Sequence, residues 1–190
     1  MRFRIQAAMV AVTALVATAC ADQATGPASS TPGNLTSGAL LARGQHNSHV
    51  IMQDACDPTT FNAIFGAGTC LRNGGVTFEQ FIEQIENSQK APGWFFAPSN
   101  INTIAGSTIT AYNRGGEVHT FTEVAAFGGG FITELNGISG NPVPAPECLN
   151  FGTMVFVPAG GSDEVTVGAA GEHHFQCCIH PWMRATAQVR

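Results

Sequence analysis

The sequence predicts an all-β sandwich preceded by a short helical extension. Between residue 93 and the C-terminus, short runs of β-branched and aromatic residues alternate with glycine-containing turns. Several short strands at regular spacing are typical of sandwiches and barrels. A single helical pattern precedes them, and roughly a hundred residues are enough for one such core.

The strand-like segments share alternation of apolar and polar residues, with Gly between them. We expect strands at 94–96, 102–104, 108–112, 119–122, 153–157, 164–167, 174–177 and 186–189. The segment 127–146 is rich in Gly and Pro, and we expect an irregular loop that walls the functional site or docks a partner.

Residues 45–92 are expected to form an N-terminal extension with one helix. Thr77 followed by Gln80 is the start of a capping box. Fewer than fifty residues with one helix would be marginally stable alone, so the extension should pack on the sandwich. Apolar residues recur at helical spacing up to about Ser88: Phe78, Phe81, Ile82 and Ile85.

The first twenty residues have the pattern of a secretory signal peptide. Arg2 and Arg4 precede an apolar run over 5–19 that is too short to span a membrane. The end of the run resembles a bacterial lipobox, which favours a lipid anchor on Cys20; plain secretion is the alternative. Residues 21–44 are rich in Ala, Thr, Ser, Gly and Pro, so we expect a flexible linker.

The chain is acidic, with 13 Asp and Glu against 8 Lys and Arg. Removal of the signal peptide would take away Arg2 and Arg4 and make the remainder more acidic. A phosphate-binding surface needs basic residues, so nucleic acid is not expected as a partner.

The most informative stretch is 175–183, which reads F-Q-C-C-I-H-P-W-M. Cys177, His180 and Met183 give the spacing C-x-x-H-x-x-M. A thiolate, an imidazole and a thioether belong to the donor set of a blue-copper electron-transfer site, which needs one more His. In an extended strand Phe175 and Cys177 share one face, so Cys177 can point inward.

Neither a zinc site nor simple core packing accounts for this stretch as well as copper does. A Cys and a His at this spacing could be half of a zinc site, but no second C-x-x-C or C-x-x-H pair exists. Core packing or an oxidised pair at Cys177 and Cys178 would not account for the His-Pro-x-Met that follows. No catalytic triad, phosphate-binding loop or supported carboxylate pair accompanies the stretch, so an enzyme is not expected.

The stretch resembles the copper loop of the cupredoxins, closely that of the amicyanin-like and plastocyanin-like members. Phe175, Cys177, His180, Pro181 and Met183 match the aromatic residue and the C-x-x-H-P-x-M of that loop. Residues 109–122 resemble the upstream segment of the family, in which a ligand His follows an Asn-containing turn. Here that residue is His119. Two residues near the thiolate differ from the family pattern. Cys178 stands where the family often has Thr or Ser, and Thr120 stands where several members have an Asn that braces the thiolate loop.

The resemblance implies a Greek-key sandwich over 93–190 that holds one type 1 copper ion. The implied ligands are His119, Cys177, His180 and a weak axial Met183. It further implies that the ring edge of His180 lies near the surface, so we expect a redox partner protein, with a basic surface, to dock near Trp182. The oligomeric state is not predicted.

The function expected from this site is the transfer of single electrons between redox partners outside the cytoplasm. Four protein ligands leave no open position for a substrate, which again argues against an enzyme. Copper delivery, storage or sensing is the alternative function. A carrier keeps its copper in both oxidation states, whereas a delivery protein releases it.

The cysteine count is consistent with an oxidising compartment. With Cys20 and Cys177 set aside, four cysteines remain, and the pairs Cys56–Cys70 and Cys148–Cys178 are expected to be disulfides. We therefore expect an exported protein, either periplasmic or membrane-anchored as a lipoprotein, with secretion as the alternative.

Overall fold

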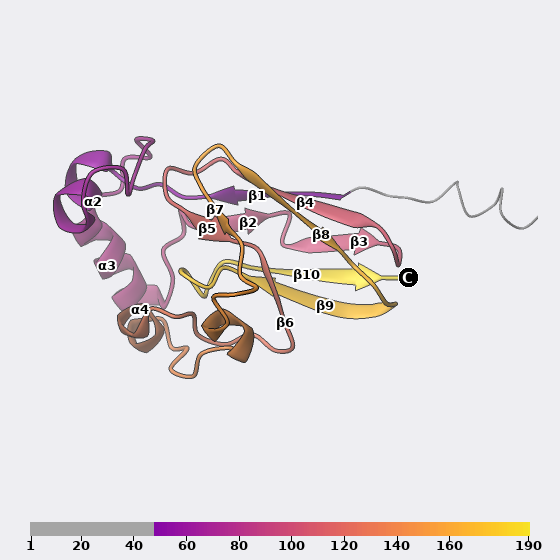
Figure 1. Ribbon diagram of the computed structural model, residues 1–190. Helices are drawn as coiled ribbons and strands as arrows, with labels where there is room; N and C mark the ends of the chain where they lie inside the picture. Colours follow the sequence, from indigo (N-terminus) through magenta and orange to yellow (C-terminus); the bar gives the residue numbers. More distant parts are fainter. Residues whose placement is uncertain (1–47) are drawn as a thin grey trace, which may run out of the picture. The chain divides into compact units, whose positions relative to one another are not determined.

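Two four-stranded β-sheets enclose one apolar core in the computed structural model, which describes residues 48–190 (Figure 1). The first sheet has the order β2 (Phe95–Ala97), β1 (Ser48–Gln53), β4 (Thr108–Asn113), β8 (Ser162–Thr166). The second has the order β3 (Asn100–Thr103), β10 (Arg184–Val189), β9 (Gly171–Gln176), β6 (Thr122–Val124). β5 (His119–Thr120) pairs with β7 (Phe156–Val157) separately. The predicted all-β sandwich is confirmed.

The core consists of the inward-facing residues of both sheets. Alternate residues of a strand point to opposite faces, so one side of each strand is buried. Phe121 and Phe175 stack inside it with their ring centroids 4.5 Å apart. The strands contribute Val50, Met52, Ile109 and Ala111 from the first sheet, and Ile101, Phe175, Ala185 and Ala187 from the second.

The N-terminal part of the described chain differs from the simple extension that the sequence suggested. β1 lies inside the first sheet, antiparallel to β2 and parallel to β4. Val50 and Met52 are fully buried in the common core. Six residues of mixed polarity are too short to distinguish a strand from a helix by periodicity, which is why this strand was not predicted.

Two helices, rather than the single expected one, lie between β1 and β2. The predicted helix is α3 (Phe78–Ser88). Its capping box has both hydrogen bonds: the Gln80 N–H donates to the Thr77 hydroxyl, and the Thr77 N–H donates to the Gln80 side-chain oxygen. The additional helix is α2 (Pro58–Phe65), which begins where the Asp57 carboxylate accepts the Thr60 N–H at 2.9 Å. Asp at the cap followed by Pro is a helix-start signal, so α2 could have been predicted from the sequence.

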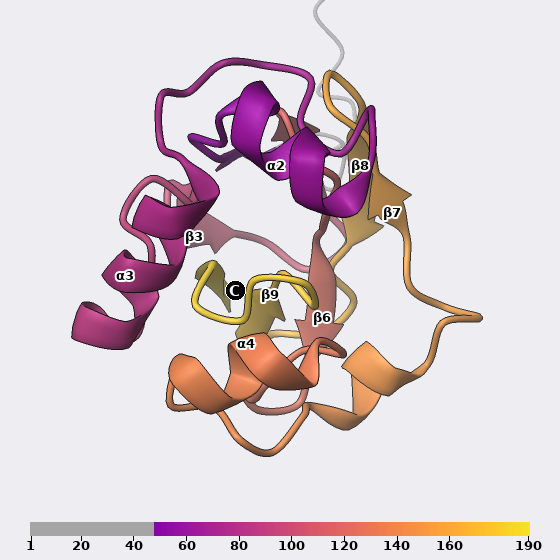
Figure 2. The ribbon, with the colours of Figure 1, turned by 90° about the vertical axis from the view of Figure 1, so that its left-hand side faces the viewer.

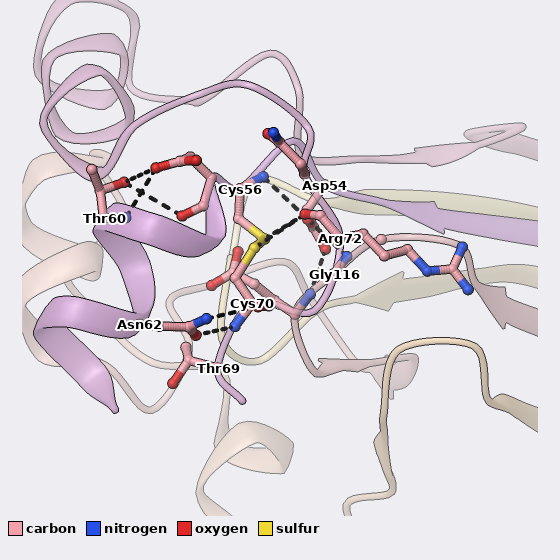
Figure 3. Close-up of a disulfide and its surroundings, with 12 residues drawn as sticks. Asp54, Cys56, Thr60, Asn62, Thr69, Cys70, Arg72 and Gly116 are labelled. Carbon is pink, nitrogen blue, oxygen red and sulfur yellow. Dashed lines mark hydrogen bonds between the residues drawn. A yellow bond between two sulfur atoms is a disulfide. The ribbon is translucent and has the colours of Figure 1, made fainter. Parts of the chain in front are cut away.

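Both expected disulfides are present, and Cys177 is the free cysteine of the described residues. Cys56–Cys70 encloses α2 and its following turn (Figure 3). The Asn62 side chain supports this turn by accepting the Cys70 N–H at 2.9 Å and donating to the Cys70 carbonyl at 3.0 Å.

The 127–146 segment is more regular than expected. It contains α4 (Thr133–Ile138), and a 3₁₀ turn at Pro146–Leu149 follows it. The Phe131 N–H donates to the Cys178 carbonyl at 2.9 Å, and a Cβ at Gly130 would lie 1.9 Å from that carbonyl oxygen. Glycine is needed here because the two backbones are in direct contact.

The predicted signal peptide, the Cys20 anchor and the 21–44 linker lie outside the described residues. Within residues 48–190, none of the helices combines the length and the apolar character needed to cross a membrane.

Removal of the Cys148–Cys178 disulfide should destabilise the fold. The bridge closes a loop with a sequence separation of 30. For a loop of this length, chain entropy predicts a loss of roughly 3–4 kcal/mol in the free energy of unfolding. We expect this loss for the double variant Cys148→Ala, Cys178→Ala in urea unfolding of the metal-free protein. An unchanged midpoint would show that the bridge does not constrain the unfolded chain.

Candidate metal centre

The stretch that carries the predicted ligands is the loop between β9 and β10, at one end of the sandwich. In Figure 2 this loop lies in the middle of the view, with α2, α3 and α4 around it. The Cys177 N–H donates to the Met183 carbonyl at 3.0 Å, and the Met183 N–H donates to the His180 carbonyl at 2.9 Å. The guanidinium of Arg184 donates to the Pro181 carbonyl at 2.7 Å. These bonds hold the loop as a tight turn.

The structure brings three of the four predicted ligands together. The Cys177 Sγ lies 3.8 Å from Nδ1 of His119 and 3.9 Å from Nδ1 of His180. All three ligand atoms lie within 4.8 Å of one another, and all three residues are buried. Met183 is fully buried on the same loop and belongs to the core of the sandwich.

The spacing of these atoms fits a single metal ion held between them. With metal–sulfur and metal–nitrogen bonds of about 2.3 and 2.0 Å, a trigonal angle places sulfur and nitrogen about 3.7 Å apart. The observed distances of 3.8 and 3.9 Å are close to this value. A thiolate with two imidazoles is the strong donor set of a blue-copper site, and imidazole with thiolate also suits zinc.

The surroundings of Cys177 favour the thiolate form of its side chain. Burial opposes ionisation, but hydrogen bonds from His119 and His180 outweigh burial and hold the pKa of Cys177 well below 9.0. The Thr120 N–H also points at the sulfur at 3.5 Å. Because the thiolate is the form that binds metals, the site favours metal coordination in the described conformation.

A buried carboxylate that no sequence pattern revealed lies behind His119. The Asp54 Oδ2 is 3.0 Å from Nε2 of His119, on the side of the ring opposite Cys177. Burial raises the pKa of Asp54, but the hydrogen bonds from His119 and from backbone N–H groups lower it to about 2. An ionised carboxylate can only accept, so Nε2 carries a proton, and Nδ1, which faces the sulfur, donates to it when the ring is doubly protonated.

The pKa of His119 follows from the same contacts. Burial alone would lower it, but the carboxylate of Asp54 and the sulfur of Cys177 raise the pKa of His119 to about 9. A carboxylate that orients the distant nitrogen of a ligand histidine is a common arrangement around metal centres.

The turn before His119 is shaped to hold Asp54. Its carboxylate accepts the N–H groups of Gly116 at 3.0 Å and Glu117 at 2.9 Å; Figure 3 shows Asp54 and Gly116 beside the Cys56–Cys70 bridge. A Cβ at Gly115 would lie 1.9 Å from Oδ2 of Asp54. Gly115 is therefore explained by contact with the carboxylate, which was not evident from the sequence, whereas a Cβ at Gly116 would lie 2.7 Å from the backbone nitrogen of Arg72.

His180 is enclosed more than the resemblance implied. Only 3% of its surface is exposed, so the ring is almost completely covered. Its ring centroid lies 6.1 Å from that of Phe81, on α3, and 6.4 Å from that of Trp94. Residues between β1 and β2 thus cover the imidazole that the resemblance would leave open.

A second buried carboxylate lies beside His180. Glu117 has Oε2 at 3.8 Å from Nε2 of His180, and the same oxygen accepts the indole N–H of Trp94 at 2.6 Å. Burial raises the pKa of Glu117, and the charge on His180 and the Trp94 bond oppose that rise. Both imidazoles of the candidate centre therefore face a carboxylate on the side away from the sulfur.

Trp182 is half-buried and packs inward. Its ring centroid lies 5.6 Å from that of His180 and 5.9 Å from that of Phe81. Docking of a partner near this residue remains a prediction, and the packing against His180 gives Trp182 a structural role as well.

Thr120 braces the loop at the position where the resemblance noted an Asn. Its hydroxyl oxygen accepts the Cys178 N–H at 2.9 Å and a hydrogen bond from the Thr122 hydroxyl at 3.1 Å. The departure from the family pattern is therefore compensated by another hydrogen-bonding side chain.

Comparison with known proteins gives distant similarities only. No family model and no curated protein matches the chain. A purple cupredoxin from Nitrosopumilus maritimus is 14% identical, with a TM-score of 0.43 over 76% of this chain and 100% of that chain. A methionine-to-alanine variant of amicyanin in the Cu(I) form is 17% identical, with a TM-score of 0.35 over 53% of this chain and 76% of that chain. A proline-to-glycine variant of amicyanin in the reduced Cu(I) form is 20% identical, with a TM-score of 0.34 over 53% of this chain and 77% of that chain. At these TM-scores the similarities carry no argument about function.

Replacement of Asp54 should strongly destabilise the metal-free protein. Asp54→Ala leaves the buried His119 without its charge partner, and breaking such a pair costs roughly 3–5 kcal/mol. Urea unfolding at neutral pH measures this loss, with the exposed Glu164→Ala on β8 as a surface control.

The same loss of stability should become smaller as the pH is lowered. The pKa of Asp54 is lowered from 3.8 to about 2 in the folded protein, so its contribution is fully present above 3.8 and disappears as the pH falls through about 2. The difference between wild type and Asp54→Ala should shrink over that range. A constant difference would contradict the ionised state of Asp54.

Proposed function

We propose that this protein is a type 1 blue-copper protein that carries single electrons between redox partners outside the cytoplasm. The observation that carries the proposal is the buried cluster of Cys177, His119 and His180, with ring nitrogens 3.8 and 3.9 Å from one sulfur. Thiolate plus imidazole donors in this arrangement match the strong ligands of such sites.

Copper would supply a one-electron couple between Cu(I) and Cu(II). The residues of the chain hold the donors in place: β5 carries His119, and the hydrogen-bonded turn after β9 carries Cys177 and His180. Donors held this rigidly change position little between the two oxidation states. Met183 would be the weak axial ligand, since it is buried on the same turn.

Membership of the cupredoxin family, with a Greek-key sandwich, is part of the proposal. It is supported by the C-x-x-H-P-x-M spacing together with the convergence of His119 on that loop. The two segments are 58 residues apart in the sequence, so their meeting is not a consequence of local structure.

Retention of copper is favoured over delivery or storage by the burial of the centre. Cys177 and His119 are fully buried, and His119 is held by Asp54. Release of a metal from such a cluster requires the loop to open. Four protein ligands would also leave no position for a substrate, so we propose a carrier rather than an enzyme.

Export is proposed from the signal-peptide pattern and is compatible with the two disulfides. The lipid on Cys20 would tether the protein to a membrane. The electron partner is proposed to be a protein with a basic surface, because the chain is acidic.

The decisive experiment is the absorption spectrum of the copper-loaded protein. A thiolate–copper charge-transfer band in the visible region should be present in wild type and absent in Cys177→Ser, because a hydroxyl is a poor ligand for copper. The double variant Cys148→Ala, Cys178→Ala is the matched control and should keep the band. A colourless wild type would overturn the proposal.

The axial role of Met183 has a separate test. Met183→Gln should keep the visible band and lower the reduction potential, because an amide oxygen stabilises Cu(II) better than a thioether does. Voltammetry measures the change. A potential that stays constant or rises would remove Met183 from the coordination sphere.

A further inference from the structure

An apolar groove lies between the helices beside the candidate metal centre. It has a volume of about 630 Å³. Four aromatic rings of α2 and α3 line one side, and residues of α4 and the Cys177–Met183 loop line the other; the main members are Phe61, Phe65, Phe78, Phe81, Leu135 and Ile138. Figure 2 shows α3 and α4 on adjacent sides of the loop. Small-molecule sites are typically apolar hollows of about 300–1,000 Å³.

Three contacts among the four rings are edge to face, and Phe78 and Phe81 are tilted at 32°. Phe78 meets Phe61 at 88° and Phe65 at 82°, with ring centroids 5.5 and 5.2 Å apart. The Phe65 side chain is 58% exposed. Aromatic ring faces carry partial negative charge, and a cation that lies over the face of a Phe ring within about 6 Å is attracted to it.

Apart from Thr69 and His180, the polar side chains that line the groove are carboxylates. Glu86 of α3, Glu134 of α4 and the buried Glu117 are among its lining residues, and no Lys or Arg of the described chain is. Burial in an apolar surrounding strengthens the attraction between a carboxylate and a cation. The groove therefore complements a molecule that is apolar and positively charged.

We propose that this groove is a binding site for a small apolar cation, of the class of aryl or alkyl quaternary ammonium compounds. Its apolar part packs on the Phe rings, and its charge faces the rings and the carboxylates of Glu86 and Glu134. His180 and Glu117 also line the groove, so the bound cation lies beside the candidate metal centre. The site is formed by protein groups alone and does not depend on the metal proposed above.

Calorimetric titration of the full mature chain with benzyltrimethylammonium tests the site, on both the metal-free and the copper-treated protein. The uncharged isostere neopentylbenzene is the matched ligand control. We expect saturable binding of the cation at least about tenfold tighter than that of the isostere, and weaker binding at high salt. Binding to the metal-free protein keeps this result separate from the test of copper.

Two pairs of variants assign the binding to the groove. Phe65→Ser should weaken binding several-fold, whereas Phe151→Ser should not, since Phe151 is also 58% exposed but lies outside the groove. Glu86→Gln should weaken binding about two- to fivefold, whereas Glu83→Gln on the same helix should leave it unchanged. All four side chains are exposed or partly exposed, so the fold should tolerate each change.

Several outcomes would overturn the proposal. Equal affinity for the cation and its isostere would remove the role of charge, and equal effects of both members of a variant pair would place the binding elsewhere. The absence of saturable binding would reject the site. A second copy of the chain is the other possible occupant, and sedimentation velocity tests it. If the protein is a dimer that does not bind the cation, and if Phe65→Ser dissociates this dimer, the groove is a dimer interface and the proposal is wrong.

Discussion

The hydrogen bond between Asp54 and His119 is the contact on which the candidate centre depends. It joins the residue after β1 to β5, which are 65 positions apart in the sequence. A buried charge is expensive unless it is paired and hydrogen-bonded, so the chain around Asp54 has little freedom. The N–H groups of Gly116 and Glu117 complete its shell, and Asn113 anchors the same turn by donating to the Glu117 carbonyl at 2.7 Å.

The segment between β1 and β2, which contains α2 and α3, directly shapes the surroundings of the site. α3 brings Phe81 against His180, and Trp94 bonds the carboxylate of Glu117. The imidazole is therefore buried, and the apolar surface of the helices is left facing α4 across a groove. A molecule in the groove meets mainly these side chains, because His180 lines the groove with only 3% of its surface exposed.

The adjacent cysteines show how strand alternation divides two roles between neighbours. Consecutive residues at the end of β9 point to opposite sides, which places Cys177 against the two histidines and Cys178 against Cys148. Cys177 lies in the main core, whereas Cys178 lies in a smaller cluster with Val124, Ala145, Cys148 and Met154. The disulfide thus anchors the thiolate loop to the 127–149 segment without taking part in the centre.

Local sequence patterns were enough to predict the sandwich, the α3 helix, both disulfides and two of the three residues that converge, Cys177 and His180; His119 was predicted from the resemblance of residues 109–122 to a cupredoxin segment. These features depend on strand alternation, a capping box, an even number of cysteines and the C-x-x-H spacing. Such patterns act over a few residues, so they can be recognised without knowledge of distant contacts.

The surroundings of the three converging residues, in contrast, come from the packing of the whole fold. Asp54 carries no distinguishing motif, and its role depends on a partner 65 positions away. The burial of His180 depends on Phe81 and Trp94, which come from segments that pack on the loop only after the chain has folded. The parallel pairing of β1 with β4 is likewise non-local, and short-range patterns contain no record of contacts of this kind.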